Sequence, residues 1–554
     1  MSSHSDLIAT EIQGAISRAI ERGELTGKVP PSIPLERPKN REHGDYASSI
    51  ALQLAKAAGK NPRDVAQLLK ADLELLDEVS SVEIAGPGFI NIKLNRASQA
   101  DLVRTILQSK EKYGEGNLLA GVKINLEFIS ANPTGPLHLG HTRWAAVGDS
   151  LGRVLSAAGA QVTREFYIND RGNQMDLFGQ SVQAVAMNQP IPEDGYQGEY
   201  ILDLAKQVLA ENPKIIELAA PERLIAFRET AYKLQLKDQQ RVLDGFNTHF
   251  DVWFSERSLH EKGSVEHGVE KLRKQGHVFE QDGATWLRTT DFGDDKDRVL
   301  VKANGDLTYF SSDTAYYISK RERGFDICIY MLGADHHGYI NRLKATAACA
   351  GDNPDYNIHV LIGQLVKIME GGEEVKLSKR AGTIITLEEL VEKVGVDAAR
   401  YTLIRYPVDT PMVMDVDVLK RNTNENPVYY VQYAHARIAA VLRNATELNI
   451  SSGLENFDPT QLIHDRENEL LGSLAEFPRV VATAAELREP HKVARYLEEL
   501  AGVYHGFYAD CRVLPMGDEA ASSLHGARLN LCAATLQVLK NGLLLLGVSA
   551  PERM

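Results

Sequence analysis

Two histidines, His138 and His141, lie three residues apart where a predicted strand gives way to a predicted helix. Residues 122–128 alternate apolar side chains, and a loop with two prolines and a glycine follows at 131–136. Apolar residues then recur with helical spacing up to Gly159. A strand followed by a helix places the helix N-terminus at the carboxyl edge of a sheet. Because open α/β sheets bind phosphorylated ligands there, the pattern predicts a nucleotide site.

Both histidines should face the same way on the first helical turn. Gly140 between them leaves the backbone bare, so a flat base could pack against it. The same spacing would suit two metal ligands. No third ligand is evident nearby in the sequence, so a zinc site is the weaker interpretation.

Polar side chains follow three predicted strands of this sheet, at 127–132, 167–173 and 333–337. A central parallel strand is usually apolar throughout, because both faces of the sheet are covered. Glu127 and Asp335 depart from that pattern. Such carboxylates belong either to a pocket or to buried structural pairs, and the neighbouring nucleotide site favours the pocket.

A cationic run, Lys376-Leu-Ser-Lys-Arg380, follows a glycine turn (the lysine segment, residues 376–380). Alone, such a run is usually a solvated face. Together with a helix start that carries histidines, it becomes a candidate clamp for a polyphosphate, where lysines would stabilise charge that develops on pyrophosphate.

The chain has 554 residues, enough for about three or four domains, and 44% hydrophobic and 25% charged residues indicate an ordinary globular protein. A net charge of −14 argues against a nucleic-acid partner, but one basic surface would suffice, so composition leaves the partner open. The four cysteines form no Cys-x-x-Cys pair, and neither a membrane-spanning run nor a secretory signal is visible. We therefore expect a cytoplasmic protein without structural zinc or disulfides.

The patterns predict an α/β protein with a parallel, Rossmann-like sheet and three domains. Residues 1–115 should form an α+β domain, with a helix over 46–57, another from Pro62, and two strands around the turn at 86–88. Residues 116–419 should hold the sheet, interrupted by a polar helical insertion over about 173–282. Residues 420–554 should form a helical bundle, with apolar spacing over 428–442, 467–487, 491–508 and 528–546.

Within the central domain, further strands are expected at 162–168, 326–332 and 358–362. Strand, helix and strand in that order predict parallel pairing with a right-handed crossover. Hairpins are expected to turn at Asn304-Gly305 and at Gly371-Gly372.

These residues resemble the class I aminoacyl-tRNA synthetases. His138-Leu-Gly-His141 corresponds to their His-Ile-Gly-His signature, and the lysine segment to their Lys-Met-Ser-Lys-Ser loop. Within that class the chain resembles the arginyl-tRNA synthetases over nearly its whole length. The resemblance is strongest in the segments 130–143, 167–175, 250–259, 286–300, 86–92, 429–437 and 551–554.

The resemblance implies a two-step reaction that activates L-arginine with ATP and transfers it to the 2′-hydroxyl of the terminal adenosine of tRNA(Arg). It implies that tRNA is bound before activation, that Mg²⁺ accompanies ATP, and that the protein holds no zinc and acts as a monomer away from membranes. The N-terminal domain would contact tRNA, and the C-terminal bundle would bind the anticodon.

Site residues follow from the matched positions. His138, His141, Lys376 and Lys379 would be the catalytic groups that bind the phosphates. The resemblance implies further ATP contacts from Thr134, Gly140, Gly333, Asp335 and Ser378. It implies arginine contacts from Glu127, Asn132, Tyr309, Asp313 and His336, the carboxylate of Asp313 accepting two parallel N–H bonds from the guanidinium.

Two positions depart from the family pattern: Arg380 replaces the last serine of the loop, and His336 stands where relatives often have glutamine. The resemblance also implies tRNA contacts from Tyr429, Tyr433 and Arg437. Aromatic residues at helical spacing are more often part of a core, so both interpretations stay open here.

Two other functions are weighed against this one. A small-molecule nucleotidyltransferase with the same fold would not need accessory domains at both ends. A non-catalytic RNA-binding relative should have lost one of the two phosphate motifs, and both are intact.

Overall fold

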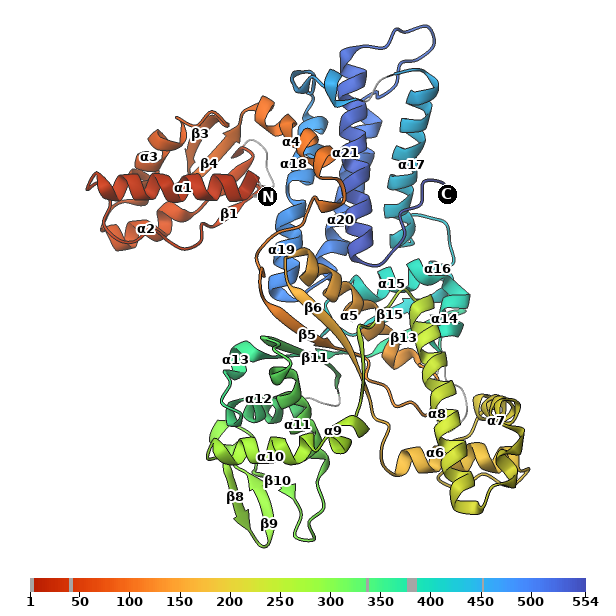
Figure 1. The fold of residues 1–554 in the computed structure, drawn as a ribbon. Coiled ribbons are helices and arrows are strands. Elements are labelled where there is room, and N and C mark those ends of the chain that lie inside the picture. The colour runs from red at the N-terminus through yellow and green to blue at the C-terminus, as the bar shows by residue number, and fades with distance from the viewer. Residues whose placement is uncertain (1–3, 39–42, 335–337, 376–385, 451–452) are drawn as a thin grey trace.

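The computed structural model describes residues 4–38, 43–334, 338–375, 386–450 and 453–554. The sheet lies at the centre of the molecule, with a helical domain on one side of it and two smaller subdomains on the other (Figure 1). No helix within the described ranges is both long and apolar enough to cross a membrane.

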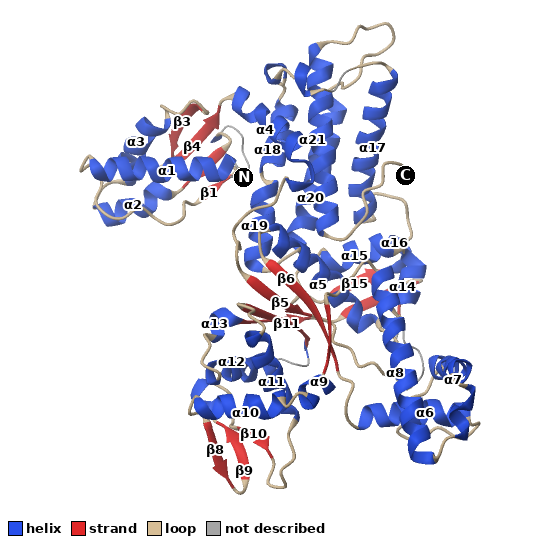
Figure 2. Cartoon of the chain, in the orientation of Figure 1, coloured by secondary structure: helices blue, strands red, loops and turns tan. Residues whose placement is uncertain are grey.

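The N-terminal domain is an antiparallel sheet covered by helices (Figure 2). Its strand order is β1-β2-β4-β3, and its core is separate from that of the rest of the chain. The elements are α1 (His4–Glu21), β1 (Leu35–Glu36), β2 (Tyr46–Ser48), α2 (Ile50–Ala58), α3 (Pro62–Leu73), β3 (Val79–Ala85) and β4 (Phe89–Leu94).

Two predictions for this domain have different outcomes. The strands around the turn at 86–88 are confirmed, with Gly86 and Gly88 at positive φ. The helix over 46–57 is wrong at its start, because residues 46–48 form a buried strand. Tyr46 pairs with Ile92 and Ser48 with Ile90, so pairing with β4 overrides the local helical pattern.

The central sheet has five parallel strands in the order β12-β11-β5-β6-β7, which confirms the predicted parallel pairing. Its strands are β5 (Lys123–Glu127), β6 (Gln161–Ile168), β7 (Val252–Ser255), β11 (Ile327–Gly333) and β12 (Ile358–Gly363). All five carboxyl ends therefore meet at one edge.

The two faces of the sheet are covered by different helices. Ile327, Ile329 and Met331 of β11 pack in the core that contains α5 (Leu139–Ala157). Cys328 and Tyr330 point to the other face, against α11 (Tyr309–Glu322) and α12 (Tyr339–Cys349). Glu127 alternates with Leu126 and Phe128 of the α5 side, so it faces α11.

A helical insertion follows β6, and it has its own core. It comprises α6 (Asn173–Ala186), α7 (Glu199–Glu211) and α8 (Ala220–Gly245), with a short 3₁₀ turn at Pro213–Glu217. The predicted insertion over 173–282 is corrected, because β7 returns to the sheet at Val252. β7 has only four residues and lies between polar helical stretches, so the sequence pattern did not reveal it.

A second small subdomain connects β7 to α11. It contains α9 (Arg257–Glu261), α10 (Ser264–Lys274), β8 (Val278–Gln281), β9 (Ala284–Leu287), a 3₁₀ turn (Thr289–Phe292) and β10 (Arg298–Val301), with sheet order β10-β9-β8. The predicted turn at Asn304-Gly305 is present, with Gly305 at φ +87° and one bridge between Val301 and Leu307. Its return limb is no strand, however, because Thr308 caps α11 instead.

A fourth sheet, β14-β13-β15, lies beside α5. β13 (Val366–Glu370) and β14 (Glu373–Glu374) form the predicted hairpin at Gly371-Gly372, and β15 (Met412–Asp415) pairs parallel with β13. The short helices α14 (Leu387–Val394), α15 (Val396–Ile404) and α16 (Val416–Leu419) complete this region, whereas α13 (Pro354–Asn357) packs against α12 and β12.

The C-terminal domain is helical, as predicted, and its core is continuous with the α5 face of the sheet. Its helices are α17 (Pro427–Glu447), α18 (Asp465–Ala475), α19 (Phe477–Leu487), α20 (His491–Asp510) and α21 (Ser523–Leu545), with 3₁₀ turns at Leu454–Asn456 and Pro459–Gln461. The expected helix over 467–487 is divided because Pro478, in the first turn of α19, cannot continue α18. α4 (Arg96–Ser109) packs against α18 and α21 although it precedes the sheet in sequence.

Candidate active site at the carboxyl edge of the sheet

The histidine turn, residues 138–141, begins α5 and caps its own backbone. His138 Nδ1 accepts a hydrogen bond from the N–H of Gly140 at 3.1 Å, and His141 Nδ1 accepts one from the N–H of His138 at 3.3 Å. The two ring centroids are 3.9 Å apart. The predicted common orientation of the two side chains is therefore confirmed.

This cap determines the tautomer of each neutral ring. Because Nδ1 accepts a backbone N–H in both residues, the proton of each neutral imidazole lies on Nε2. Each Nε2 can then donate a hydrogen bond at a helix N-terminus, where the backbone dipole also favours negative charge.

Gly140 is exposed, but a side chain at this position would meet the capping ring of His138. A Cβ on Gly140 would lie 2.9 Å from Cε1 of His138. This contact favours glycine within the turn, and the packing of a flat base against Gly140 stays a prediction.

The loop between β5 and α5 is held by the helical insertion. Gln239 of α8 donates to the carbonyl oxygens of Asn132 and Gly135 at 3.1 and 2.8 Å, and Tyr200 of α7 donates to that of Thr134 at 3.1 Å. Thr134 itself is buried. Ile129 adopts φ +69°, which is strained for a β-branched residue and marks a loop fixed by its surroundings.

Glu127 at the end of β5 lies in a buried ion pair. Its Oε2 is 2.5 Å from Nζ of Lys320 on α11, and its Oε1 accepts a hydrogen bond from Ser130 at 3.0 Å. Lys320 is fully buried, with its ammonium 4.2 and 3.9 Å from the ring centroids of Tyr316 and Tyr330. Of the two interpretations weighed for Glu127, the buried structural pair is therefore present, and its place in a substrate pocket stays a prediction.

Asp313 lies on α11, the helix that carries Lys320, but its environment is different. The hydroxyl of Tyr339 donates to its carboxylate, and it forms no salt bridge with a residue in the described ranges. Burial raises the pKa of Asp313 to about 6. A carboxylate in this position would gain from a cation brought by a ligand.

Two other residues predicted to contact arginine lie within the described ranges. Tyr309, one turn before Asp313 on α11, is 78% exposed. The amide of Asn132 donates to the side-chain oxygen of Gln174 at the start of α6, at 2.7 Å.

Sequence reasoning missed Lys320 and Glu256. Lys320 belongs to a stripe on α11 that the sequence displays, since residues 309, 313, 316 and 320 recur at helical spacing. Glu256 directly follows β7 and is buried, so finding it required recognising that strand. Burial raises the pKa of Glu256, and the nearby charge of Asp313 raises it further.

Several predicted residues lie outside the described ranges: Asp335, His336, Lys376, Ser378 and Lys379. The described residues beside the lysine segment lie close to the histidine turn. Thr386 bridges to His138, and the N–H of Leu387 donates to the carbonyl oxygen of Leu137 at 2.9 Å. Gly333 pairs with Gly363 at the carboxyl edge.

Tyr429, Tyr433 and Arg437 form a ladder on α17. The two tyrosine rings stack with centroids 5.9 Å apart, and the guanidinium of Arg437 lies 4.9 Å above Tyr433. Tyr508 of α20 lies on the other side of the same guanidinium at 5.2 Å. All three predicted residues are half-buried, so their faces are only partly covered by the core.

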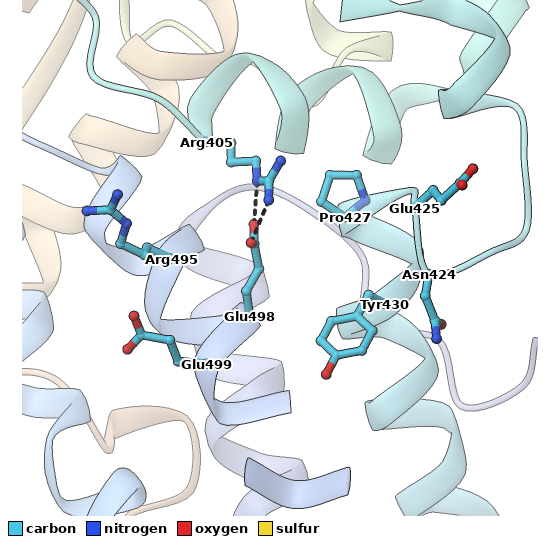
Figure 3. A pocket seen from close by; sticks show the side chains of 8 residues that line it. All are labelled: Arg405, Asn424, Glu425, Pro427, Tyr430, Arg495, Glu498 and Glu499. Carbon is cyan, nitrogen blue, oxygen red and sulfur yellow. Dashed lines mark hydrogen bonds and ion pairs between the residues drawn. The ribbon is translucent and has the colours of Figure 1, made fainter. Parts of the chain in front are cut away.

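A cavity of about 380 Å³ lies away from the sheet edge, between α15, α17 and α20 (Figure 3). Its charged walls are largely paired: Arg405 donates to both oxygens of Glu498 at 2.7 and 2.9 Å, and Glu425 is paired with Arg421. All four cysteines are free and buried. No group of three His, Cys, Asp or Glu side chains among the described residues could hold a metal ion.

Three family models match the chain in succession. The model "Arginyl tRNA synthetase N terminal domain" matches residues 6–94, "tRNA synthetases class I (R), catalytic domain" matches 102–437, and "DALR anticodon binding domain" matches 431–554.

Curated relatives match end to end. The arginine–tRNA ligase of Pseudarthrobacter chlorophenolicus is 53% identical over 553 residues, and that of Frankia alni is 54% identical over 547 residues, each alignment covering 99% of both chains. Among solved structures, arginyl-tRNA synthetase of Thermus thermophilus superposes with a TM-score of 0.76 at 22% identity, covering 99% of both chains. That of Plasmodium falciparum gives 0.75 at 17% over the whole of both chains. These two superpositions establish the fold.

Proposed function

The chain belongs to the arginyl-tRNA synthetases of class I, and from that membership we propose how its sheet edge joins arginine to tRNA. Its function is that of an arginine–tRNA ligase with ATP as a substrate. The proposal concerns which residues perform each step.

In the first step, a carboxylate oxygen of arginine attacks the α-phosphorus of ATP, and pyrophosphate leaves with the electrons of the broken P–O bond. In the second step, the 2′-hydroxyl of the terminal adenosine of tRNA(Arg) attacks the carbonyl carbon of arginyl-adenylate and loses its proton, and AMP leaves. Positioning and charge stabilisation can supply most of the acceleration of the first step. Mg²⁺ enters with ATP as a substrate ion.

His138 and His141 bind the ATP phosphates through their Nε2 protons and the helix N-terminus. What supports this role is the cap, which leaves a donor on Nε2 of each neutral ring. Lys376 and Lys379 stabilise the leaving pyrophosphate, and Ser378 lies between them in the sequence. Thr134, Gly140, Gly333 and Asp335 complete the nucleotide site.

The arginine guanidinium binds Asp313 and Tyr309, and its α-amino group binds Glu127 and Asn132, with His336 a further contact. The observation that carries this assignment is the contrast between two carboxylates: Glu127 already has Lys320, while Asp313 has no ion-pair partner among described residues. A guanidinium supplies the missing cation and a fork that fits a carboxylate. Lysine lacks the fork, so acceptors would stay unpaired and lysine would be rejected strongly.

Tyr429, Tyr433 and Arg437 contact the anticodon region of the tRNA. Their half-exposed ladder offers faces on which bases can stack, worth about 1–3 kcal/mol per base. The enzyme acts as a monomer in the cytoplasm, and tRNA binding precedes activation of arginine.

ATP–pyrophosphate exchange, measured with each amino acid and with and without tRNA, tests the proposal. We expect exchange with arginine alone, and only when tRNA is present. Exchange with another amino acid would contradict the assigned pocket, and exchange that is indifferent to tRNA would contradict the proposed order of binding.

A further inference from the structure

Arg143 is a buried arginine whose function the two phosphate motifs leave unexplained. It lies on α5 two residues after His141 and is 3% exposed. Its guanidinium donates to three backbone carbonyl oxygens: those of Gln364 at 3.1 Å, Thr410 at 3.0 Å and Pro407 at 2.7 Å.

The three carbonyl groups mark the place where β13 and β15 begin. Gln364 lies between β12 and β13, and Pro407 and Thr410 lie between α15 and β15. The two connections also bond to each other, since the N–H of Gln364 donates to the carbonyl oxygen of Val408 at 2.9 Å. Arg143 thus fastens the fourth sheet to the helix that carries the histidine turn.

The neighbouring residue makes the same connection by packing. A Cβ on Gly363 would lie 2.5 Å from Cζ2 of Trp144, so the end of β12 is pressed against the indole ring. Arg143 and Trp144 together fix where the chain leaves β12 and enters β13, which leads through the Gly371-Gly372 hairpin to residue 376.

The charge of Arg143 is expensive to bury in this place. Arg143 forms no salt bridge with any described residue, its Nε has no hydrogen-bond partner, and burial lowers its pKa to about 10. Buried ion pairs can often be replaced by apolar side chains of similar volume without loss of stability, so burial of charge by itself gives no reason for an arginine here. An arginine is therefore better explained here by the geometry that its three directed bonds impose.

We propose that Arg143 is a positioning residue for the activation step, which fixes β13, the strand that precedes the lysine segment in the chain, relative to the histidine turn. The inference rests on the proposed roles of His138, His141, Lys376 and Lys379. The inference concerns ATP, whose phosphates are proposed to contact both the histidine turn and the lysine segment. AMP lacks the β- and γ-phosphates and therefore serves as an internal reference.

The test compares Arg143→Met with Arg104→Met. Arg104 also donates to two backbone carbonyl oxygens, those of Leu454 and Phe457 at 3.0 and 2.7 Å, but it lies on α4 away from the sheet edge. We expect Arg143→Met to slow arginine-dependent exchange by roughly 100-fold. By calorimetry it should weaken ATP binding about tenfold and leave AMP binding unchanged. Arg143→Lys, which keeps the charge and can reach part of the carbonyl set, should recover part of both losses, and Arg104→Met should change neither.

Equal weakening of ATP and AMP, or unchanged kinetics in a folded Arg143→Met protein, would overturn the inference. If Arg143→Met does not fold, Arg143→Lys carries the same comparison of ATP with AMP. A double variant with Lys376→Ala separates the inference from the function on which it rests. If Lys376→Ala alone leaves exchange unchanged, the lysine role fails; if it slows exchange and the Arg143 loss simply adds to it, the positioning role fails.

Discussion

The first turn of α5 and the polar face of α11 meet at the same sheet edge, yet their side chains find partners in different ways. On α5, His138 and His141 bond to the backbone of their own turn. On α11, Lys320 and Asp313 bond to side chains from β5 and α12. Because the capping bonds use Nδ1 of both rings, a phosphate that binds through Nε2 leaves the cap in place.

The α11 face is rigid by comparison. Lys320 is fully buried, so moving it away from Glu127 would leave a charge unpaired in the interior. On the proposed assignment, this face is built before the substrate arrives, and arginine brings the cation that Asp313 lacks among the described residues. The nucleotide end would then keep its own backbone bonds when ATP binds, while the amino-acid end would select the substrate.

Asp313→Asn should have the largest effect. The substitution removes the charge proposed to bind the guanidinium, and we expect kcat/KM for arginine to fall about 1,000-fold with KM for ATP unchanged. The free energy of unfolding should increase although activity falls. The pKa of Asp313 rises from 3.8 to about 6 in the fold, so removing the charge at pH 7 should stabilise the free protein by at most about 3 kcal/mol.

Thermal unfolding and steady-state kinetics on the same preparation measure both effects. A variant that loses activity because it is less stable would contradict the proposed role. Asp326→Asn is a control on the same sheet, because Asp326 accepts from the backbone N–H of Lys123 at the opposite end of β5.

Glu127→Gln tests whether the ion pair with Lys320 is structural, substrate-binding or both. Leaving the Lys320 ammonium without its carboxylate should destabilise the fold by about 3 kcal/mol, measured by denaturant unfolding. The double variant Glu127→Gln/Lys320→Met should recover most of that stability, because the unpaired charge is gone. We expect its activity to stay low, since Glu127 is also proposed to bind the α-amino group. Recovery of activity together with stability would show that the pair is only structural.

The difference between the two regions also separates what the sequence could predict from what it could not. The histidine turn is local: a strand, a proline-rich loop and a helix start are adjacent in the chain, and the predicted common orientation of the two histidines is confirmed. The α11 pocket depends on tertiary contacts. A fully buried lysine contradicts the usual preference of lysine for the surface, so Lys320 was missed although its helical stripe was visible.

The strands β2 and β7 are among those that were missed, for a related reason. β2 and β7 have three and four residues, too few for periodicity to reveal them, and both owe their conformation to a neighbouring strand. Glu256 was missed because β7 was. The longer strands β6, β11 and β12 were predicted within a residue or so. In β11 and β12 an apolar run marks a buried parallel strand without reference to its partners.

His138→Asn should have a smaller and more selective effect. Asparagine is a good N-cap, so α5 should keep its first turn and the free energy of unfolding should change by less than about 0.5 kcal/mol. The Nε2 donor is lost, and kcat for exchange should fall roughly 100-fold. His464→Asn is a matched control, because His464 caps α18 with the same kind of capping box. A large loss of stability in His138→Asn, or an equal loss of activity in His464→Asn, would contradict the proposal that His138 caps the helix through Nδ1 and binds phosphate separately through Nε2.

The pH dependence of arginine binding should show the smallest effect. It tests the proposed role of the Asp313 carboxylate without any substitution. The guanidinium binds ionised Asp313, whose pKa in the free site is about 6. KM for arginine should therefore be constant above pH 7 and rise about tenfold for each pH unit below 6, while KM for ATP does not follow it.

The stability of the free protein provides an independent test, because the same carboxylate should change it in the opposite direction with pH. Because the pKa of Asp313 is higher in the folded protein than in the unfolded chain, this group makes the fold more stable as the pH falls from about 6 toward 3.8. Arginine binding and this contribution to stability thus change in opposite directions over the same interval. Acid unfolding would weaken both together, so a parallel decline would assign the pH effect to the fold as a whole instead of to Asp313.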